Sequence, residues 1–119
     1  MQFNAQDLHD QLLAASDVTL QSLDFGVIGM GDTHRVVFYN DAEAAAAGLS
    51  AERVLGRHFF TEVAPCTNNF MVAQRFEGEP TFDATIAYVF TLRMRPTPVA
   101  LRLLQREGAA RQFLLVQRG

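Results

Sequence analysis

The apolar residues of this sequence change their spacing several times, and each change marks a predicted element. Within residues 4–15 three leucines recur at the spacing of one helix face, which predicts a short amphipathic helix. Two runs rich in β-branched and aromatic residues follow at 25–30 and 35–40, on either side of the turn sequence at 31–33. These two runs predict a β-hairpin.

The middle of the chain is typical of a string of short helices. Residues 41–47 are mainly alanine, and Ser50 is expected to cap another helical turn that ends at Gly56. The residue before Pro65 is disfavoured in the helical region, so the chain should extend or turn there. Residues 67–76 then predict a further helix, capped by the threonine or the asparagine at its start.

Three strand-like runs complete the chain. They cover residues 82–93, 98–105 and 111–117, and the turn sequences Arg-Pro-Thr-Pro and Arg-Glu-Gly-Ala-Ala separate them. Together with the hairpin they predict an α+β domain: a five-stranded antiparallel sheet with short helices on one face and an N-terminal helical cap. This order of elements is similar to that of PAS domains.

The length of the chain, 119 residues, fits one domain over 1–119, with a helical cap at 1–22 and a core at 23–119. Hydrophobic residues make up 49% of the chain and charged residues 19%, which favours folding over disorder. All ten cationic residues are arginine. The absence of lysine excludes Schiff-base and pyridoxal phosphate chemistry.

Charge and cysteine usage restrict the partners and the compartment. The formal net charge is −3 and the arginines form no basic run, so we expect neither nucleic acid nor a membrane as partner. The chain has one cysteine, no signal-peptide pattern and no apolar run of roughly 18–20 residues. We therefore expect a cytoplasmic protein, a monomer or weak homodimer.

Cys66 is the one candidate nucleophile. It lies just before the predicted helix over 67–76, where free backbone amides would stabilise a thiolate. A role as a small buried hydrophobe stays equally open. None of the three histidines has a spacing that ties it to the cysteine, so we expect no enzymatic activity.

Tyr39 and Glu43 form a second candidate site, four residues apart where a predicted strand passes into a helix. Both side chains should project to the same side, and both can donate a hydrogen bond if the carboxyl is protonated. The surrounding alanines leave room for a ligand and favour the neutral carboxyl by desolvation. The alternative is an exposed glutamate beside an ordinary aromatic residue.

Both candidates occur together in one known family. The segments FYNDAE at 38–43, VLGRHFFTEVAPCT at 54–67 and FTLRMRPTPV at 90–99 resemble the photoactive yellow proteins, small bacterial blue-light receptors with a PAS fold. The similarity runs from LDFGVIG at 23–29 to FLLVQR at 113–118.

The resemblance implies a light-sensing site. Cys66 would carry p-coumaric (4-hydroxycinnamic) acid as a thioester, Tyr39 and Glu43 would hydrogen-bond its phenolate oxygen, and Met94 would lie over it. Photoisomerisation would then trigger proton transfer and partial unfolding of the N-terminal cap, which would signal to an unidentified downstream signalling protein. The other pocket positions implied are Ala47, Leu49, Phe59, Ala64, Pro65 and Phe90.

Two pocket positions depart from the family pattern. Ala47 stands where the family has a threonine, and Leu49 stands where it has an arginine. A lost hydroxyl and a lost cation both weaken phenolate stabilisation, so the absorption could divide between neutral and ionised chromophore. A non-photoactive PAS module that binds another small ligand or a protein partner is therefore the alternative function, and a thiol enzyme or redox sensor is a third.

Overall fold

The computed structural model describes residues 1–31, 33–92 and 94–118. No helix in these residues is long and apolar enough to cross a membrane. The elements, in chain order, are α1 (Leu8–Ala14), α2 (Asp17–Gln21), β1 (Gly26–Met30), β2 (Val36–Tyr39), α3 (Asp41–Ala47), α4 (Ala51–Val54), the π-helical η1 (Phe59–Val63), the 3-10 turn η2 (Pro65–Thr67), α5 (Ala73–Gly78), β3 (Phe82–Leu92), β4 (Arg95–Gln105) and β5 (Gln112–Arg118).

The strands form one antiparallel sheet in the order β2-β1-β5-β4-β3. The register pairs Ile28 of β1 with Tyr39 on one side and with Leu114 of β5 on the other. Because β5 lies at the centre, the last strand of the chain joins the hairpin to β4 and β3. The predicted α+β class, the PAS fold and the five-stranded antiparallel sheet are confirmed.

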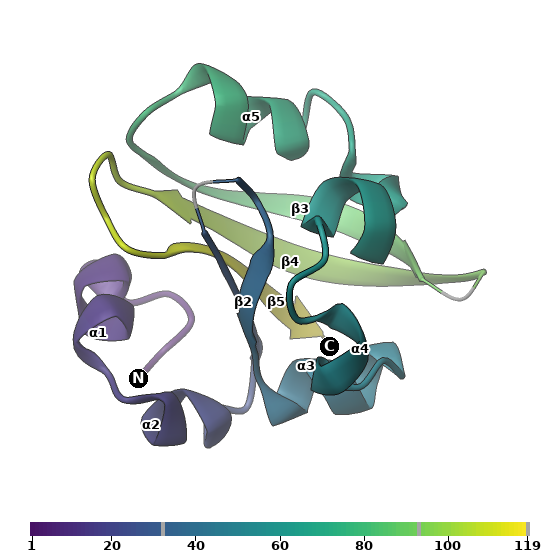
Figure 1. Ribbon diagram of the computed structural model, residues 1–119, viewed down its shortest axis with the longest axis horizontal. Coiled ribbons are helices and arrows are strands. Elements are labelled where there is room, and N and C mark those ends of the chain that lie inside the picture. The colour runs from purple at the N-terminus through teal and green to yellow at the C-terminus, as the bar shows by residue number, and fades with distance from the viewer. Residues whose placement is uncertain (32, 93, 119) are drawn as a thin grey trace.

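The sheet has a buried core on each face, because neighbouring residues of a strand point to opposite sides. Ile28 and Leu114 belong to a cluster with the η1 phenylalanines and α5. Val27 and Leu115 belong to a second cluster with leucines of α1 and α2. Figure 1 shows α1 and α2 near the N-terminus, on the opposite side of β2 from α3 and α4. The segment 1–22 therefore covers one face and the remaining helices the other.

The structure corrects three local predictions. The helix expected over 4–15 is limited to Leu8–Ala14, and a separate α2 follows because the Ser16 hydroxyl accepts a hydrogen bond from the Thr19 amide. Ser50 occupies the cap position of α4 without the side-chain hydrogen bond that was expected. The predicted turn at 95–98 is part of β4, which has a neighbour only on its β3 side there, and such positions tolerate proline.

The helix expected over 67–76 is the fourth correction. Its only α-helical part is the start of α5, because the Asn69 side chain caps residues 71 and 72 while the Thr67 hydroxyl bonds back to the Ala64 carbonyl. Residue 32 of the predicted hairpin turn, residue 93 of the predicted third strand and residue 119 of the predicted domain lie outside the described residues.

Asn40 joins β1, α2 and α3. Its Oδ1 accepts hydrogen bonds from the Val27 and Glu43 amides at 2.9 and 3.1 Å, and its Nδ2 donates to the Leu20 and Phe25 carbonyls at 3.2 and 3.0 Å. The side chain is fully buried and its amide is saturated. This junction fixes the start of α3 relative to the sheet and the N-terminal cap.

Arginines from the sheet hold the N-terminal cap. Arg102 of β4 donates to the carbonyls of Phe3 and Ala5 at 2.8 and 2.7 Å while it pairs with Asp83 of β3. Nearby, an aspartate of α1 pairs with Arg106 and an aspartate of α2 with Arg111. The cap is thus attached by polar contacts as well as by its leucines.

Replacing Asn40 by alanine should destabilise the fold, because four backbone groups would lose their partner in a buried place. We expect a loss of about 2–4 kcal/mol in the free energy of unfolding, measured by urea denaturation. Asn68→Ala, at an exposed asparagine, is the control and should stay within about 0.5 kcal/mol. An equal effect of both substitutions would contradict the role of Asn40.

His9 should make the docking of the cap sensitive to acid. Burial lowers the pKa of His9 below 6.5, and the charge of Arg106 adds to this, against opposing contributions from the Arg111 carbonyl, Asp10 and Asp83. The unfolded chain therefore takes up the proton first, so stability should fall as the pH drops through roughly 6.5 towards 5.

The measurement is urea denaturation of the wild type and His9→Phe across that pH range. The substitution removes the titrating group while keeping an aromatic ring beside Phe113. The stability difference between the two proteins should change with pH in the stated direction. A difference that stays constant would show that His9 does not titrate on unfolding.

Candidate functional site

Tyr39 and Glu43 lie where β2 ends and α3 begins. Asn40 between them is the N-cap of α3, and its Oδ1 accepts the Glu43 amide, which places Glu43 in the first helical turn. Both side chains turn inward: Tyr39 is 2% exposed and Glu43 is 1% exposed. The predicted juxtaposition is therefore present, and the alternative of an exposed glutamate is wrong.

The Tyr39 hydroxyl makes no hydrogen bond within the part of the chain that the structure describes, and its oxygen is not among the fully buried polar atoms. Burial raises the pKa of this phenol, the Glu43 carboxylate raises it further, and the Arg118 guanidinium opposes them. Tyr39 is therefore a neutral hydroxyl in the core that is free to donate a hydrogen bond to a ligand.

Glu43 forms an ion pair that the sequence did not reveal. Arg118 Nη1 lies 2.7 Å from Oε1, and Nη2 lies 3.1 Å from Oε2. The guanidinium also stacks over the Phe90 ring, 5.8 Å from its centroid. The pKa of Glu43 is raised above its ordinary value, because burial outweighs the opposing hydrogen bond and charge of Arg118.

Gly26 of β1 makes room for this carboxylate. A Cβ added at Gly26 would overlap Glu43 Oε1 and crowd the rest of that side chain. Neither Gly26 nor Arg118 was singled out from the sequence, because their contacts with Glu43 cross from β1 and β5 to α3. The one sequence signal for Arg118 was its position directly after the last predicted strand, at 111–117.

Cys66 lies in η2, a single 3-10 turn, and its free thiol is partly buried. Its carbonyl accepts hydrogen bonds from the Tyr88 hydroxyl at 2.5 Å and from Asn69 Nδ2 at 3.3 Å, which fix the turn against β3. The α-helix expected directly after Cys66 is not there, because α5 begins only at Ala73.

The core cluster connects these groups. Tyr39 belongs to it together with Phe59, Ala64 and Phe90, and Cys66 and Leu49 pack against it. Cys66 and Tyr39 therefore lie on the same face of the sheet.

The remaining predicted positions are more scattered. Ala47 is buried at the end of α3, and Pro65 is exposed at the start of η2. Met94 is 92% exposed at the turn between β3 and β4, in a left-handed conformation with φ 59°. In this structure Met94 does not cover the site.

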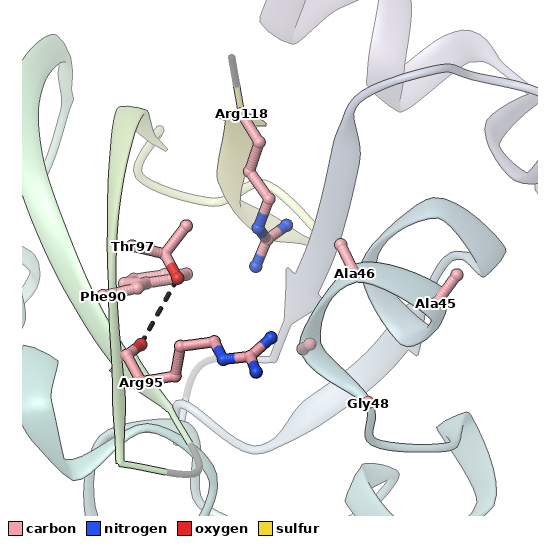
Figure 2. Close-up of a pocket in the computed structure, with 8 residues that line it drawn as sticks. Ala45, Ala46, Gly48, Phe90, Arg95, Thr97 and Arg118 are labelled. Carbon is pink, nitrogen blue, oxygen red and sulfur yellow. Dashed lines mark hydrogen bonds between the residues drawn. The ribbon is translucent and has the colours of Figure 1, made fainter.

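A groove of about 580 Å³ opens between the end of α3 and strands β3–β5, lined by Ala45, Ala46, Ala47, Gly48, Phe90, Arg95, Thr97 and Arg118. Figure 2 shows the guanidinium groups of Arg95 and Arg118 pointing into it from two strands. We expected that Leu49, in place of an arginine, would leave the pocket without a cation. The groove nevertheless contains two arginines. Positive charge comes from β4 and β5 instead.

Comparisons with known proteins agree with this geometry. Residues 16–117 match the family described as PAS fold. The chain is 31% identical to photoactive yellow protein of Rhodothalassium salexigens, with 99% of this chain and 97% of the relative covered. It is 34% identical to that of Halochromatium salexigens, with 85% and 83% covered.

Solved structures support the same assignment. The photoactive yellow protein domain of the sensor histidine kinase Ppr from Rhodospirillum centenum has a TM-score of 0.79 and 33% identity, with 87% of this chain and 94% of that domain covered. The PAS domain of an HTR-like protein from Haloarcula marismortui, 15% identical over 96% of this chain and 98% of that one, has a TM-score of 0.66 and shows the fold alone.

The fold and the site define a PAS domain. Within that class the chain belongs to the photoactive yellow protein family, and the resemblance noted from the sequence is confirmed. It is thus a photoreceptor domain of that family's type.

Gly26→Ala should disturb the Glu43–Arg118 ion pair from β1. The added methyl group must displace the Glu43 carboxylate from Arg118, so we expect a loss of about 1–3 kcal/mol in the free energy of unfolding. Gly31→Ala is the matched control in the same hairpin, since its Cβ would meet only Val37 Cγ1 at an ordinary 3.7 Å. If both variants unfold at the same urea concentration, the space at Gly26 is not needed.

Proposed function

We propose that this domain senses blue light through p-coumaric acid held as a thioester on Cys66. The observation that carries the proposal is the Tyr39 side chain, which is 2% exposed and whose hydroxyl makes no hydrogen bond within the described residues. Tyr39 belongs to the core cluster against which Cys66 packs. A hydroxyaromatic group would supply the missing hydrogen-bond acceptor.

The residues present suit such a group. The Cys66 thiol would hold it covalently, and the hydrogen bonds from Tyr88 and Asn69 to the Cys66 carbonyl would keep the attachment point in place. Tyr39 would donate a hydrogen bond to its hydroxyl oxygen. The bound group would supply light absorption and a double bond that isomerises.

The apolar residues of the site would keep water out. Phe59, Ala64 and Phe90 are almost completely buried in the same cluster. A dry environment strengthens the hydrogen bonds of Tyr39 and Glu43, because competing water is absent. These residues therefore account for selectivity and colour tuning rather than for attachment.

The output would be a loosening of the N-terminal cap, read by a downstream signalling protein. Asn40 supports this route, since the same side chain caps α3 and holds the Leu20 carbonyl of α2. A shift at the start of α3 therefore acts on the cap through one shared side chain.

A PAS module for another small ligand is the second candidate. The observation in its favour is the open groove, into which Arg95 and Arg118 direct their guanidinium groups. A small anion with an apolar body would suit that lining. The experiment on Cys66 separates the two candidates.

The apoprotein should react with p-coumaric anhydride at Cys66. The thiol proton is lost, a sulfur–carbonyl bond forms and the p-coumarate half of the anhydride leaves. Intact mass spectrometry should show one adduct, absent in Cys66→Ser, and the adduct's absorption should change reversibly under illumination. Hydrogen exchange in residues 1–22 should be faster in the light than in the dark.

Two results would contradict the proposal. One is an unmodified Cys66 after treatment of folded protein. The other is an adduct whose absorption and hydrogen exchange are the same in light and darkness. A binding module without a chromophore would then remain, and its test is small-anion binding that survives in Cys66→Ser.

A further inference from the structure

The sheet has one edge strand at each end of its strand order, and the two edges differ. At β2 the edge is only four residues long, and the chain at residues 56 and 57 bonds to its start. The Val36 amide donates to the Arg57 carbonyl at 2.9 Å, and the Gly56 amide donates to the Val36 carbonyl at 2.8 Å. This edge therefore offers little backbone with which another strand could pair.

Strand β4 has an open stretch where β5 does not reach. The β4–β5 pairing begins at Val99, so residues 95–98 have a neighbouring strand only on the β3 side. Pro96 and Pro98 lie in this stretch. Proline has no amide hydrogen to donate, so it opposes pairing with a further strand. The sequence thus protects this part of the sheet.

The β3 edge has neither kind of protection. β3 is 11 residues long and pairs with β4 along its whole length without a bulge. It contains no lysine, arginine, proline or glycine. Its one charged residue, Asp83, accepts hydrogen bonds of 2.9 and 2.8 Å from Arg102. A long, regular edge of this composition is the kind that pairs with another strand.

The outer side of β3 carries backbone groups without partners. In an antiparallel pair, every second residue of a strand directs its N–H and C=O groups away from the neighbouring strand. On the outer side of β3 these groups form no hydrogen bond to any residue that the structure describes. A second strand laid along this side would satisfy them together.

Exposed apolar side chains lie beside the same edge. Val89 of β3 is 50% exposed. Its neighbour Tyr88 points to the other face of the sheet, where its hydroxyl accepts a hydrogen bond from Asn69 Nδ2 at 2.7 Å. Phe70, the residue after Asn69, is 74% exposed. An added strand would therefore find apolar side chains to pack against as well as backbone groups to pair with.

The difference between the two edges indicates which partner fits. A protein with two open edges can add copies at both and grow into a fibre, whereas a protein with one open edge pairs once and stops. Antiparallel pairing of β3 with β3 of a second copy uses both open edges around a two-fold axis and closes the assembly. Charge does not oppose it, because each strand brings one carboxylate that Arg102 already neutralises.

We propose that two copies of this chain associate through antiparallel pairing of their β3 strands, which joins their two sheets into one continuous sheet. The inference goes beyond the proposed function and needs no chromophore. Edge pairing adds backbone hydrogen bonds and only a narrow band of side chains, so its interface is smaller than that of a stable dimer. We therefore expect a weak dimer that dissociates on dilution.

The first test measures the mass of chromophore-free protein by sedimentation equilibrium. Between about 10 µM and about 1 mM, the wild type should pass from the monomer mass of 13.2 kDa to twice that mass, with no larger species. A protein that stays monomeric throughout would overturn the inference and leave the edge to a strand of another protein. Species that keep growing with concentration would overturn the closed dimer.

The second test places a charge on each edge strand in turn. Val89 of β3 and Val37 of β2 are similarly exposed, at 50% and 46%, so Val37→Lys is the matched control for Val89→Lys. Val89→Lys should raise the Kd of the dimer roughly threefold or more, because it adds a cation on both sides of the shared edge. Val89→Lys combined with Ala87→Lys should raise it about tenfold or more. Val37→Lys should leave it unchanged.

Two results with these variants would contradict the pairing of β3. One is a dimer that Val37→Lys weakens as much as Val89→Lys does. The other is a dimer that the double substitution at residues 87 and 89 leaves intact, because the contact would then lie on another surface.

Hydrogen exchange tests the same contact in the unchanged protein, so the inference stays testable even if a variant fails to fold. Amides on the outer side of β3 should exchange about threefold more slowly, or slower still, where the dimer predominates than in dilute protein, and amides of β2 should not change. Protection confined to other segments would overturn the inference. A Cys66 that takes up no p-coumaric acid defeats the proposed function alone, since the dimer is measured without it.

Discussion

The Asn40 side chain is the constraint on which the site depends. It uses both its oxygen and its amide nitrogen to hold backbone groups of β1, α2, α3 and the segment between α2 and β1. Tyr39 and Glu43 flank it in sequence, so the orientation of both is set by this buried amide. Water cannot take the place of the Asn40 amide in this closed core, so the hydrogen bonds of Asn40 keep the junction rigid.

The second constraint is the burial of a carboxyl group. Moving Glu43 from water into the core costs free energy that its partner must offset, and Arg118 does so from the opposite end of the chain, 75 residues away. The stacking of Arg118 on Phe90 and the missing side chain at Gly26 shape the same place. Residues of α3, β1, β3 and β5 therefore meet around one carboxyl group. Substitutions there should affect the site most strongly.

The strands and the Tyr39–Glu43 pair could be predicted because their signals are local: strand periodicity, turn residues and a spacing of four along one helix. Arg118 and Gly26 could not, since their roles arise from strand register. The helix expected after Cys66 was wrong because the Asn69 side chain captures two amides in a turn. Likewise, the prolines of β4 lie where that strand has one neighbour, which composition does not reveal.

The central strand β5 gives the site and the cap a common support. Leu114 and Val116 face the cluster that contains Tyr39, whereas Phe113 and Leu115 face the leucines of α1 and α2. The strand ends at Arg118 beside Glu43, and Arg111, just before it, pairs with α2. A change in the charge of Glu43 acts on one end of this strand, and the cap rests on the other. The physical connection between the site and the proposed output is therefore short.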